Sequence, residues 1–278
     1  MISNEYPSLK DKIVIVTGVS RGIGRAIAEA FVAAGSRVFG SARSDPALPG
    51  ITWVRADMAT PEAGPALVAR AVADAGGLDI VVNSVGGLAE PIDPREQRKH
   101  QLGSSVDLPD EVWRTTMDIN LYAAVRTIRA AMPHLLERRG NIVNISTVAA
   151  VQPDPSMIDY AAAKAALNAY TKGIATEFGP RGVRANIVSS GAILTPGWTA
   201  DGGLFELISE KMGIARDKVL DHLVKGPEGI AHGGAVLGRF GDVAEIASTV
   251  LFLASDGAGY ITGADVRVDG GLTRSIST

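Results

Sequence analysis

Residues 13–24, with the sequence IVIVTGVSRGIG, decide the fold of this chain. Ile13 to Val16 form a continuous β-branched run, which predicts a strand buried on both faces of a parallel sheet. A glycine-rich turn follows, and then a helix with one apolar face that ends at Gly35. Glycines at such a turn let the backbone approach a pyrophosphate, whose charge is stabilised at a helix N-terminus. The stretch therefore predicts a nucleotide-binding unit, and a purely structural turn is the alternative.

Further strands and helices alternate along the chain. Helix signals include Thr60 as N-cap with Pro61 at the first helical position, and a long amphipathic segment from Pro109 to Arg138. Residues 88–108 are rich in proline, glycine and polar residues and are expected to form an extended loop. This alternation predicts an α/β fold with a doubly wound parallel sheet, Rossmann-type, of about seven strands. The six further predicted strands are Arg37–Gly40, Trp53–Ala56, Asp79–Val82, Asn141–Ile145, Arg184–Val188 and Asp265–Val268.

The segment 196–240 departs from this tight alternation. It contains two short predicted helices, 202–212 and 216–224, between glycine-rich turns. In a compact α/β chain such an excursion is usually a lid or a binding surface. We expect a single domain, residues 1–278, in which 196–240 is a helical substrate-binding lid. The apolar residues of the first short helix could line a substrate pocket, or they could pack the lid onto the body or onto a neighbouring subunit. Asp242 and Glu245, spaced as a capping box, open the next helix, which runs to Ala254.

The composition is that of an ordinary globular protein. The chain has 278 residues, 46% of them hydrophobic and 21% charged, with a net charge of −3, so nothing indicates a nucleic-acid partner. It contains no cysteine, and its four histidines match no metal-ligand spacing, so we expect no metal site. The N-terminus does not resemble a signal peptide, and the apolar runs are too short to span a membrane. We therefore expect a cytoplasmic protein.

Tyr160 and Lys164 lie four residues apart on a predicted helix that begins near Asp159 and ends at Gly179-Pro180. The two side chains would project side by side. At an effective dielectric constant of about 20, a cation roughly 5 Å away favours a tyrosinate by about 3 kcal/mol, or about two pKa units. We therefore expect Lys164 to lower the pKa of Tyr160 and to make the phenol a usable acid or base near neutral pH. A surface lysine beside a half-buried tyrosine is the alternative.

The end of the second strand carries information on the cofactor. NAD-binding folds usually place an acidic residue there to bond the ribose 2′-hydroxyl. Here Arg43 stands in that turn, and the nearest acid, Asp45, comes later. Arg43 could hold a 2′-phosphate, with help from Arg21 in the glycine turn, so the sequence favours NADP(H) over NAD(H). Two solvated arginines are the alternative.

Together these motifs closely resemble those of the short-chain dehydrogenase/reductase family, over about residues 10–271. The resemblance is strongest to the branch that contains acyl-carrier-protein ketoreductase-like enzymes, which are often tetramers. Each motif is loose alone, but their joint order and spacing are specific. The matching motifs are Thr17-Gly18-x-x-x-Gly22-x-Gly24, Asp57, Asn83-x-x-Gly86, Asn120, Tyr160-x-x-x-Lys164 and Asp269-Gly270-Gly271.

The resemblance implies roles for individual residues. Tyr160 would be the acid for carbonyl reduction or the base for alcohol oxidation. Lys164 would bind the nicotinamide ribose and lower the tyrosine pKa, and Asn120 would hold a water that links Lys164 to a proton relay. Asp57 would contact the adenine, and Asn83 would line the cofactor cleft. The full set implied for cofactor binding is Gly18, Ser20, Arg21, Gly22, Ile23, Gly24, Arg43, Asp57, Met58, Asn83, Gly86, Tyr160, Lys164, Gly191, Ile193 and Thr195.

Three positions depart from the family pattern. The family's catalytic serine usually lies thirteen residues before the tyrosine, where this chain has Thr147; Ser146 lies one residue earlier and could take its place after a shift of the loop. The usual Asn-Asn-Ala-Gly reads Asn83-Ser84-Val85-Gly86, which keeps its first and last residues. Ser190 stands where proline is common, and we expect it to loosen the turn before Gly191.

The resemblance therefore implies an oxidoreductase that moves hydride between NADP(H), or NAD(H), and a small-molecule carbonyl or secondary alcohol. A homo-oligomer, tetramer or dimer, is the expected assembly. The alternative is a non-catalytic nucleotide-sensing or scaffolding protein that keeps the cofactor cleft. Asn120, Tyr160 and Lys164 argue against that alternative, because a pure binder has no need of a tuned phenol.

Overall fold

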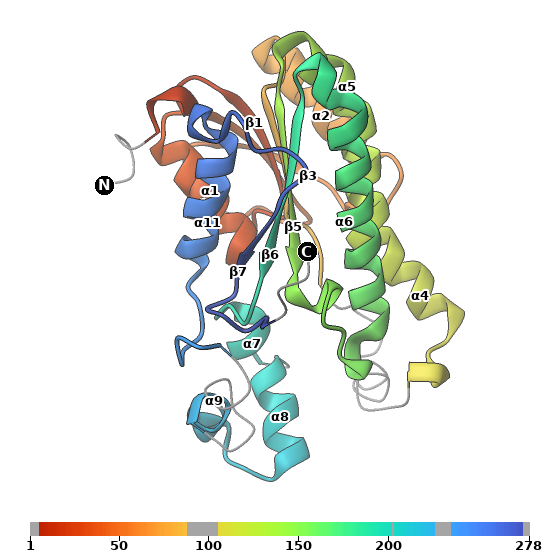
Figure 1. Cartoon of the computed structure of the whole chain (residues 1–278), viewed down its shortest axis with the longest axis vertical. Coiled ribbons are helices and arrows are strands. Elements are labelled where there is room, and N and C mark those ends of the chain that lie inside the picture. Colours follow the sequence, from red (N-terminus) through yellow and green to blue (C-terminus); the bar gives the residue numbers. More distant parts are fainter. Residues whose placement is uncertain (1–5, 88–104, 202, 226–234, 275–278) are drawn as a thin grey trace.

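Seven strands form one parallel sheet in the computed structural model, which describes residues 6–87, 105–201, 203–225 and 235–274 (Figure 1). The strand order is β3-β2-β1-β4-β5-β6-β7. The doubly wound parallel sheet predicted from the sequence is therefore confirmed. The strands are β1 (Ile13–Thr17), β2 (Arg37–Ala42), β3 (Ile51–Arg55), β4 (Ile80–Asn83), β5 (Asn141–Thr147), β6 (Arg184–Ser190) and β7 (Asp265–Val268).

Helices cover both faces of this sheet. One apolar core lies between the sheet and α1 and α11, and a second lies between the sheet and α2, α5 and α6, as the two sides of Figure 1 show. β1 is buried along its whole length because both of its faces are covered. The main helices are α1 (Gly22–Ala33), α2 (Ala63–Ala75), α4 (Asp110–Met117), α5 (Ala123–Arg138), α6 (Ile158–Phe178), α7 (Pro196–Thr199), α8 (Leu204–Met212), α9 (Arg216–Lys225) and α11 (Val243–Ala254).

The order of the strands reverses next to β1. The chain runs outward through β2 and β3, then returns to the other side of β1 with β4. In open parallel sheets the crevice for a ligand lies beyond the carboxyl ends of the strands at this point of reversal. The glycine turn after β1 and the turn after β4 therefore face each other at the same edge of the sheet.

Several predicted boundaries were wrong, and three of the predicted strands, β2, β5 and β6, end two residues later than expected. The third strand begins at Ile51, two residues earlier than predicted, because Gly50 (φ 81°) makes the turn and pairing with β2 starts directly after it. The next helix does not begin at Thr60 and Pro61. The hydroxyl of Thr60 donates to the carbonyl of Asp57 within a turn, and α2 begins at Ala63.

The predicted helix 109–138 is interrupted by one wide turn. α4 and α5 are joined by a π-helical turn, Asp118–Tyr122, and Asn120 is buried within it. Such turns are rare and frequently lie at functional sites. The predicted loop 88–108 lies outside the described residues up to residue 104; Ser105–Asp107 forms a short 3₁₀ turn.

The segment 196–240 leaves the sheet after β6 and forms α7, α8 and α9 below its carboxyl edge in Figure 1. Trp198, Phe205 and Phe240 pack edge to face, with ring centroids 5.0 to 6.2 Å apart. They form the centre of a small apolar cluster separate from the two main cores. Phe205 therefore packs within the segment itself. The predicted capping box of Asp242 and Glu245 at the start of α11 is confirmed.

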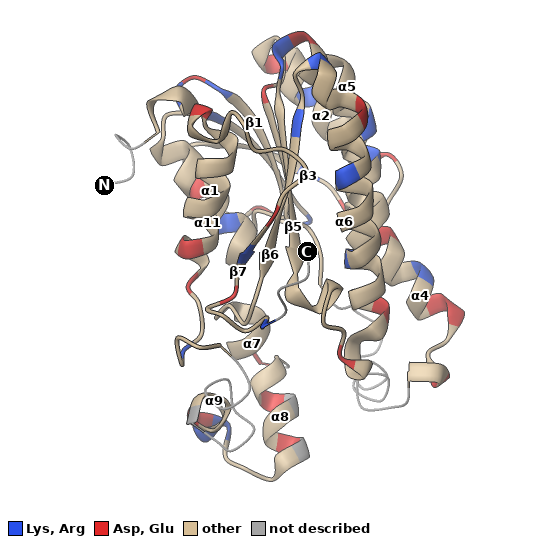
Figure 2. Cartoon of the chain, in the orientation of Figure 1, with Lys and Arg blue, Asp and Glu red and all other residues tan. Residues whose placement is uncertain are grey.

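Charges of both signs are distributed over the helices that flank the sheet (Figure 2). In the described part of the chain no helix is long and apolar enough to cross a membrane. The same residues contain no group of three histidine, aspartate or glutamate side chains that could hold a metal ion. His100 and His232 lie outside the described residues.

Candidate active site

The glycine turn after β1 is held from two sides. The buried hydroxyl of Thr17 accepts hydrogen bonds from the backbone N–H groups of Ser84 (3.0 Å) and Val85 (3.1 Å), in the turn after β4. On the other side, the Gly18 N–H donates to the carbonyl of Ser41 at the end of β2 (3.0 Å). Gly18 has φ 79°, a conformation that favours glycine. These contacts fix the turn at the point where the strand order reverses.

The start of α1 fits the phosphates of a dinucleotide. Gly22 opens the helix with φ 58°, and no side chain caps its first turn. A Cβ on Gly24 would collide with the backbone carbonyl of Gly18, so only glycine lets the helix approach the turn this closely. Uncapped N–H groups at a helix start are suited to an anion. Ser20 and Arg21 are exposed beside them.

The residues expected around the adenosine lie in the turns after β2 and β3. Arg43 is exposed, and both Arg43 and Arg21 take part in interactions within the chain. The carboxylate of Asp57 is exposed and accepts a hydrogen bond from the Ala59 N–H (3.1 Å). Met58 is buried and packs in a small apolar cluster under this turn. Met58 therefore supports the turn from below.

Tyr160, Lys164 and Thr147 meet where α6 crosses the end of β5. The Lys164 Nζ lies 5.9 Å from the centroid of the Tyr160 ring, as the predicted i and i+4 spacing requires. The Thr147 side chain makes a hydrogen bond with the Tyr160 side chain. Lys164 is buried, and its ammonium donates to the backbone carbonyl of Ile145 (3.0 Å).

The expected lowering of the tyrosine pKa was wrong. Burial raises the pKa of Tyr160 to about 12, although the hydrogen bond with Thr147 lowers it. Burial also lowers the pKa of Lys164 to about 8. The sequence argument counted only the attraction between the two groups, whereas removing either charge from water costs more free energy here. Tyr160 is therefore protonated at neutral pH, although the residue as a whole is partly accessible.

The two candidate hydroxyls after β5 have different surroundings. Thr147 contacts the Tyr160 phenol, whereas the buried hydroxyl of Ser146 has no hydrogen-bond partner among the described residues. The geometry thus favours Thr147 as the group beside the phenol. Ser190, which was expected to loosen the neighbouring turn, makes a hydrogen bond across the sheet. Its hydroxyl donates to the carbonyl of Ser146 (3.1 Å) and ties β6 to β5.

Asn120 holds the turn after β4 with its whole side-chain amide. Its Nδ2 donates to the carbonyls of Gly87 (2.8 Å) and Thr116 (3.0 Å), and its Oδ1 accepts from the Gly87 N–H (2.9 Å). A Cβ placed on Gly86 would lie 2.7 Å from both Asn120 Oδ1 and Lys164 Nζ. Asn120 and Lys164 therefore converge over Gly86, and one lone pair of the amide oxygen is left for another donor.

Asn83 differs from its expected position. Its side chain is buried and donates to Asn144 Oδ1 (2.8 Å), and Asn144 in turn donates to the Thr171 hydroxyl on α6 (2.7 Å). The amide of Asn83 thus links β4 to β5 and α6 within the protein.

The loop after β6 runs along the glycine turn. A Cβ on Gly22 would lie 3.6 Å from Thr195, so these two residues are neighbours. A Cβ on Gly191 would lie 2.7 Å from the Cα of Asp269, so glycine is needed where this loop passes the end of β7. Ile193 is buried and pairs with Gly241 in an isolated parallel bridge.

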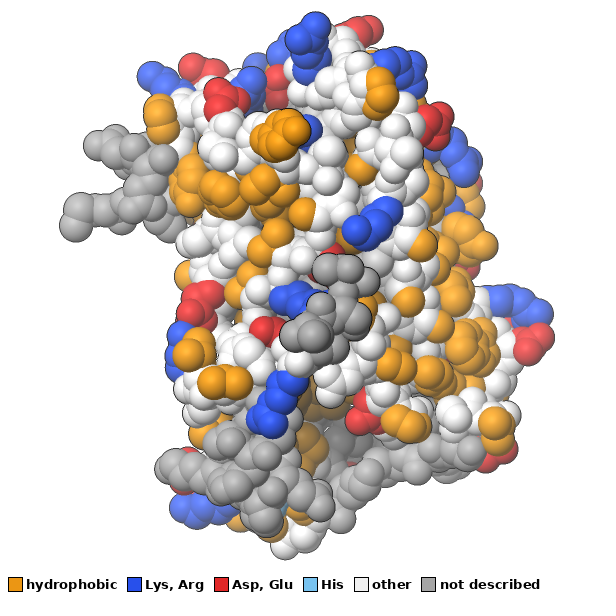
Figure 3. Space-filling view, in the orientation of Figure 1, with side chains coloured by type: hydrophobic (Ala, Val, Ile, Leu, Met, Phe, Trp, Pro, Cys, Tyr) orange, Lys and Arg blue, Asp and Glu red, His pale blue; other side chains and the backbone are white. Residues whose placement is uncertain are grey.

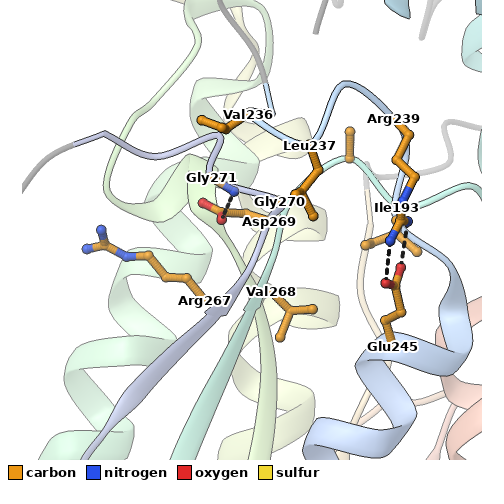
Figure 4. A pocket seen from close by; sticks show the side chains of 12 residues that line it. Ile193, Val236, Leu237, Arg239, Glu245, Arg267, Val268, Asp269, Gly270 and Gly271 are labelled. Atoms are coloured by element: carbon orange, nitrogen blue, oxygen red, sulfur yellow. Dashed lines mark hydrogen bonds and ion pairs between the residues drawn. The ribbon is translucent and has the colours of Figure 1, made fainter. Parts of the chain in front are cut away.

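A cavity of about 500 Å³ lies between this loop, residues 236–241 and the end of β7 (Figure 4). Of the candidate site residues, its lining includes Ile193. Arg239 forms a two-point ion pair with Glu245 at its wall, and Asp269 accepts from the Gly271 N–H. The candidate chemistry therefore lies outside this cavity.

Three polar side chains that organise the site were not singled out from the sequence. Ser41 holds the glycine turn together with Thr17 of the matched motif, and Thr116 and Asp159 form a buried hydrogen bond beside Asn120 and Tyr160. Ser41 and Asp159 follow or precede recognisable motifs, but their partners are distant in sequence. No local pattern could have shown these contacts.

Known proteins resemble the chain over nearly its whole length. The sequence pattern of a family described as enoyl-(acyl carrier protein) reductase matches residues 18–273. The chain is 33% identical to 3beta-hydroxysteroid dehydrogenase 1 of Eggerthella lenta, over 96% of each protein. It is 32% identical to a 3-oxoacyl-[acyl-carrier-protein] reductase of Salmonella typhimurium, over 95% of this chain and 98% of that one. Its fold superposes on L-sorbose reductase from Gluconobacter frateurii, solved with NADPH and L-sorbose, with a TM-score of 0.83, 29% identity and coverage of 97% and 99%.

Proposed function

The chain belongs to the short-chain dehydrogenase/reductase family of NAD(P)-dependent oxidoreductases, and we propose that it transfers hydride between NADP(H) and a carbonyl or secondary alcohol. The observation that carries this proposal is the meeting of Thr147, Tyr160 and Lys164 at the end of β5. A bound nicotinamide would supply or accept the hydride, and the protein would supply orientation and the proton.

Each of these residues has a proposed task. The Thr147 hydroxyl orients the substrate oxygen beside the phenol, in place of the serine usual in the family. Tyr160 transfers its proton to that oxygen as the carbonyl is reduced, or removes the proton from an alcohol in the reverse direction. Lys164 binds the nicotinamide ribose, and Asn120 holds the turn of Gly86 and Gly87 that borders the same cleft.

The protonated phenol favours the reducing direction at neutral pH. A general acid must hold its proton when the reaction starts, and the raised pKa of Tyr160, about 12, meets that condition. Alcohol oxidation needs the tyrosinate, which becomes more populated as pH rises. We therefore propose that carbonyl reduction is the faster reaction near pH 7 and that alcohol oxidation accelerates in alkaline buffer.

Preference for NADP(H) is part of the proposal. Arg43 stands where an acidic residue would select NAD(H), and Arg21 is exposed in the glycine turn. Parallel titrations of the purified protein with NADPH and NADH, followed by nicotinamide fluorescence, test this preference. NADPH should bind at least roughly tenfold more tightly, and Arg43→Ala should remove most of that difference. Equal affinities for the two nucleotides would refute the assignment of Arg43.

The segment 196–240 is proposed as the substrate lid. Its helices lie below the carboxyl edge of the sheet, and Thr195 at its base adjoins the glycine turn. The related proteins are named for steroids, sugars and acyl carriers, so the class of substrate proposed here is a small molecule with a ketone or secondary alcohol. The segment's own residues do not select among these.

We also propose a homo-oligomer and a cytoplasmic location. The outer face of α6 carries mostly small residues, including exposed Ala169, and Tyr122 is 47% exposed on the neighbouring helix. Figure 3 shows hydrophobic side chains gathered at the right-hand edge, over the region where Figure 1 places α4 and α6. A contact between copies of the chain would bury this surface.

The decisive experiment compares wild type with Tyr160→Phe. The substitution removes only the phenol oxygen, so the variant should lose roughly a thousandfold or more in turnover while keeping its affinity for NADPH. Turnover is measured on a panel of carbonyl compounds by following the oxidation of NADPH through its nicotinamide absorbance. The affinity for NADPH is measured by fluorescence titration. Tyr170→Phe, on the same helix, is the matched control and should keep full activity. Full turnover by Tyr160→Phe would refute the proposed mechanism.

A further inference from the structure

A buried hydrogen bond joins the helix that carries Asn120 to the helix that carries Tyr160. Thr116, in the last turn before the π-helical turn, donates from its hydroxyl to Oδ2 of Asp159 over 2.6 Å. Thr116 is completely buried, and Asp159 is 6% exposed. A carboxylate is costly to bury unless donors satisfy it, so a short bond of this kind is a strong constraint on both helices.

The contact continues from Thr116 to the turn after β4. The carbonyl of Thr116 accepts from Asn120 Nδ2, and the same amide binds both the N–H and the carbonyl of Gly87. Thr116 therefore contacts Asp159 with its side chain and Asn120 with its backbone. A shift of Thr116 would move the amide that holds the Gly86–Gly87 turn over Lys164.

On the other side, Asp159 directly precedes Tyr160 in the first turn of α6. No side chain caps this helix start, and the preceding Met157 is not helical. The bond from Thr116 therefore anchors the first turn, where a carboxylate is also favoured by the helix dipole. Rotation of this turn would change the direction of the Tyr160 phenol relative to Thr147.

We infer that Thr116 and Asp159 are positioning residues, which hold the Asn120 turn and the Tyr160 helix in one fixed relation. Neither touches the reacting atoms, and both act through the residues beside them. The inference rests on the proposed function, because it assigns these two residues to the alignment of the same site. A merely stabilising bond is the competing explanation, and it predicts loss of stability without a specific loss of turnover.

The test uses Thr116→Val, which keeps the side-chain shape and removes the donor, and Thr116→Ser, which restores it. Thr127→Val is the matched control: Thr127 is equally buried, and its hydroxyl donates to the Ala123 carbonyl within α5 (2.8 Å). Thr116→Val should lower kcat roughly ten- to a hundredfold, with KM for the carbonyl and for NADPH changed by less than about threefold. Thr116→Ser should recover most of this kcat, and Thr127→Val should keep it.

Equal kcat in Thr116→Val and Thr127→Val would refute the inference, as would a change confined to KM. If Thr116→Val does not fold, Asp159→Asn takes its place, since asparagine keeps an acceptor of the same size but loses the charge. Asp159→Asn should then lower kcat without a comparable change in KM. Unchanged kcat in a folded Asp159→Asn would count against the positioning role.

A second readout separates this inference from the proposed function. If wild type reduces no carbonyl at all, the proposed function fails, and amide hydrogen exchange decides the positioning question. Thr116→Val should speed exchange in peptides covering 116–122 and 158–164, and leave α1 unchanged. Thr127→Val should not reproduce that pattern. Identical exchange in the two variants would show that the Thr116–Asp159 bond does not hold the two helices in register.

Discussion

Lys164 is proposed to bind the nicotinamide ribose, and burial lowers the pKa of its ammonium group. The folded chain releases this proton near pH 8, whereas the ordinary value is 10.5. Between these two pH values the unfolded chain binds more protons than the folded chain, so stability rises with pH across that window. Below about pH 8 both states are protonated, and the cost of the buried ammonium is present in full.

This rise of stability with pH can be measured as a change in the free energy of unfolding. From pH 8 to 9.5, wild type should gain about 2 kcal/mol relative to Lys164→Met, which has no proton to release. Urea titrations of both proteins at several pH values provide the comparison, and they stay below pH 10 because Tyr160 contributes with the opposite sign between about pH 10 and 12. Lys172→Met, at an exposed lysine of the same helix, is the control. Parallel pH slopes in wild type and Lys164→Met would show that Lys164 is charged in the folded chain throughout.

Gly86 offers a second prediction at the residue scale. A Cβ there would approach Asn120 Oδ1 and Lys164 Nζ to 2.7 Å, closer than real contacts allow, so one of the two must move. Gly86→Ala should therefore lower turnover and weaken NADPH binding, each by roughly tenfold, with little loss of global stability. Steady-state kinetics and fluorescence titration measure these effects. Gly179→Ala, where a Cβ meets nothing within 4 Å, should leave both unchanged.

At the scale of elements, the strands were the most predictable part of the chain. Runs such as Ile13–Val16 have no polar residue, which only a strand covered on both faces tolerates, and glycine or proline ended most elements where expected. The start of α2 was missed because Thr60 and Pro61 form a turn with Asp57 that has the same residue types as a helix cap. The π-helical turn at Asn120 was missed because nothing in its sequence distinguishes it from an ordinary helix.

In the candidate site, too, features within one short motif could be predicted from the sequence, whereas contacts between distant residues could not. Residues within one motif, such as Tyr160 and Lys164, could be placed from their spacing, and so could the glycine turn. The buried bond between Thr116 and Asp159 joins residues 43 apart, and only the packing of α4 against α6 brings them together. The pKa of Tyr160 depends on how much protein surrounds the phenol, which the spacing of two residues does not reveal.

The apolar cluster of the segment 196–240 gives a prediction for an element. Phe205 is buried between Trp198 and Phe240, in a cluster separate from the main cores. Phe205→Ala should remove about 3 kcal/mol of local packing and loosen α8, so the KM for substrate should rise roughly tenfold or more while NADPH affinity holds. Steady-state kinetics and amide hydrogen exchange across 196–225 measure this.

Phe31→Ala, in the main core, supplies the comparison, because Phe31 is completely buried against the sheet. It should lower the global melting temperature far more than Phe205→Ala does. An equal fall in both variants, without any change in KM, would mean that the segment 196–240 unfolds together with the sheet.

At the scale of the whole molecule, the outer face of α6 gives a prediction about assembly. A chain of 28.9 kDa should elute and scatter light as a particle two or four times that mass. Ala169→Arg places a long charged side chain on the exposed face of α6 and should shift the protein toward the monomer. Ala69→Arg, at an exposed alanine of α2, should keep the wild-type mass. Unaltered assembly in Ala169→Arg would place the contact on another face.

The bridge between Ile193 and Gly241 has a consequence for how such proteins diversify. Two further backbone bonds, from the N–H of Leu194 to the carbonyl of Gly241 and from the N–H of Gly241 to the carbonyl of Ala192, close the same junction. Of the described residues between them, α7, α8 and α9 lie outside the sheet. Insertions, deletions or exchanges within the proposed lid therefore leave the register of every strand unchanged, and lengthening such a closed excursion costs little entropy. The proposed lid can therefore change in length and sequence while the sheet that carries the candidate site stays the same.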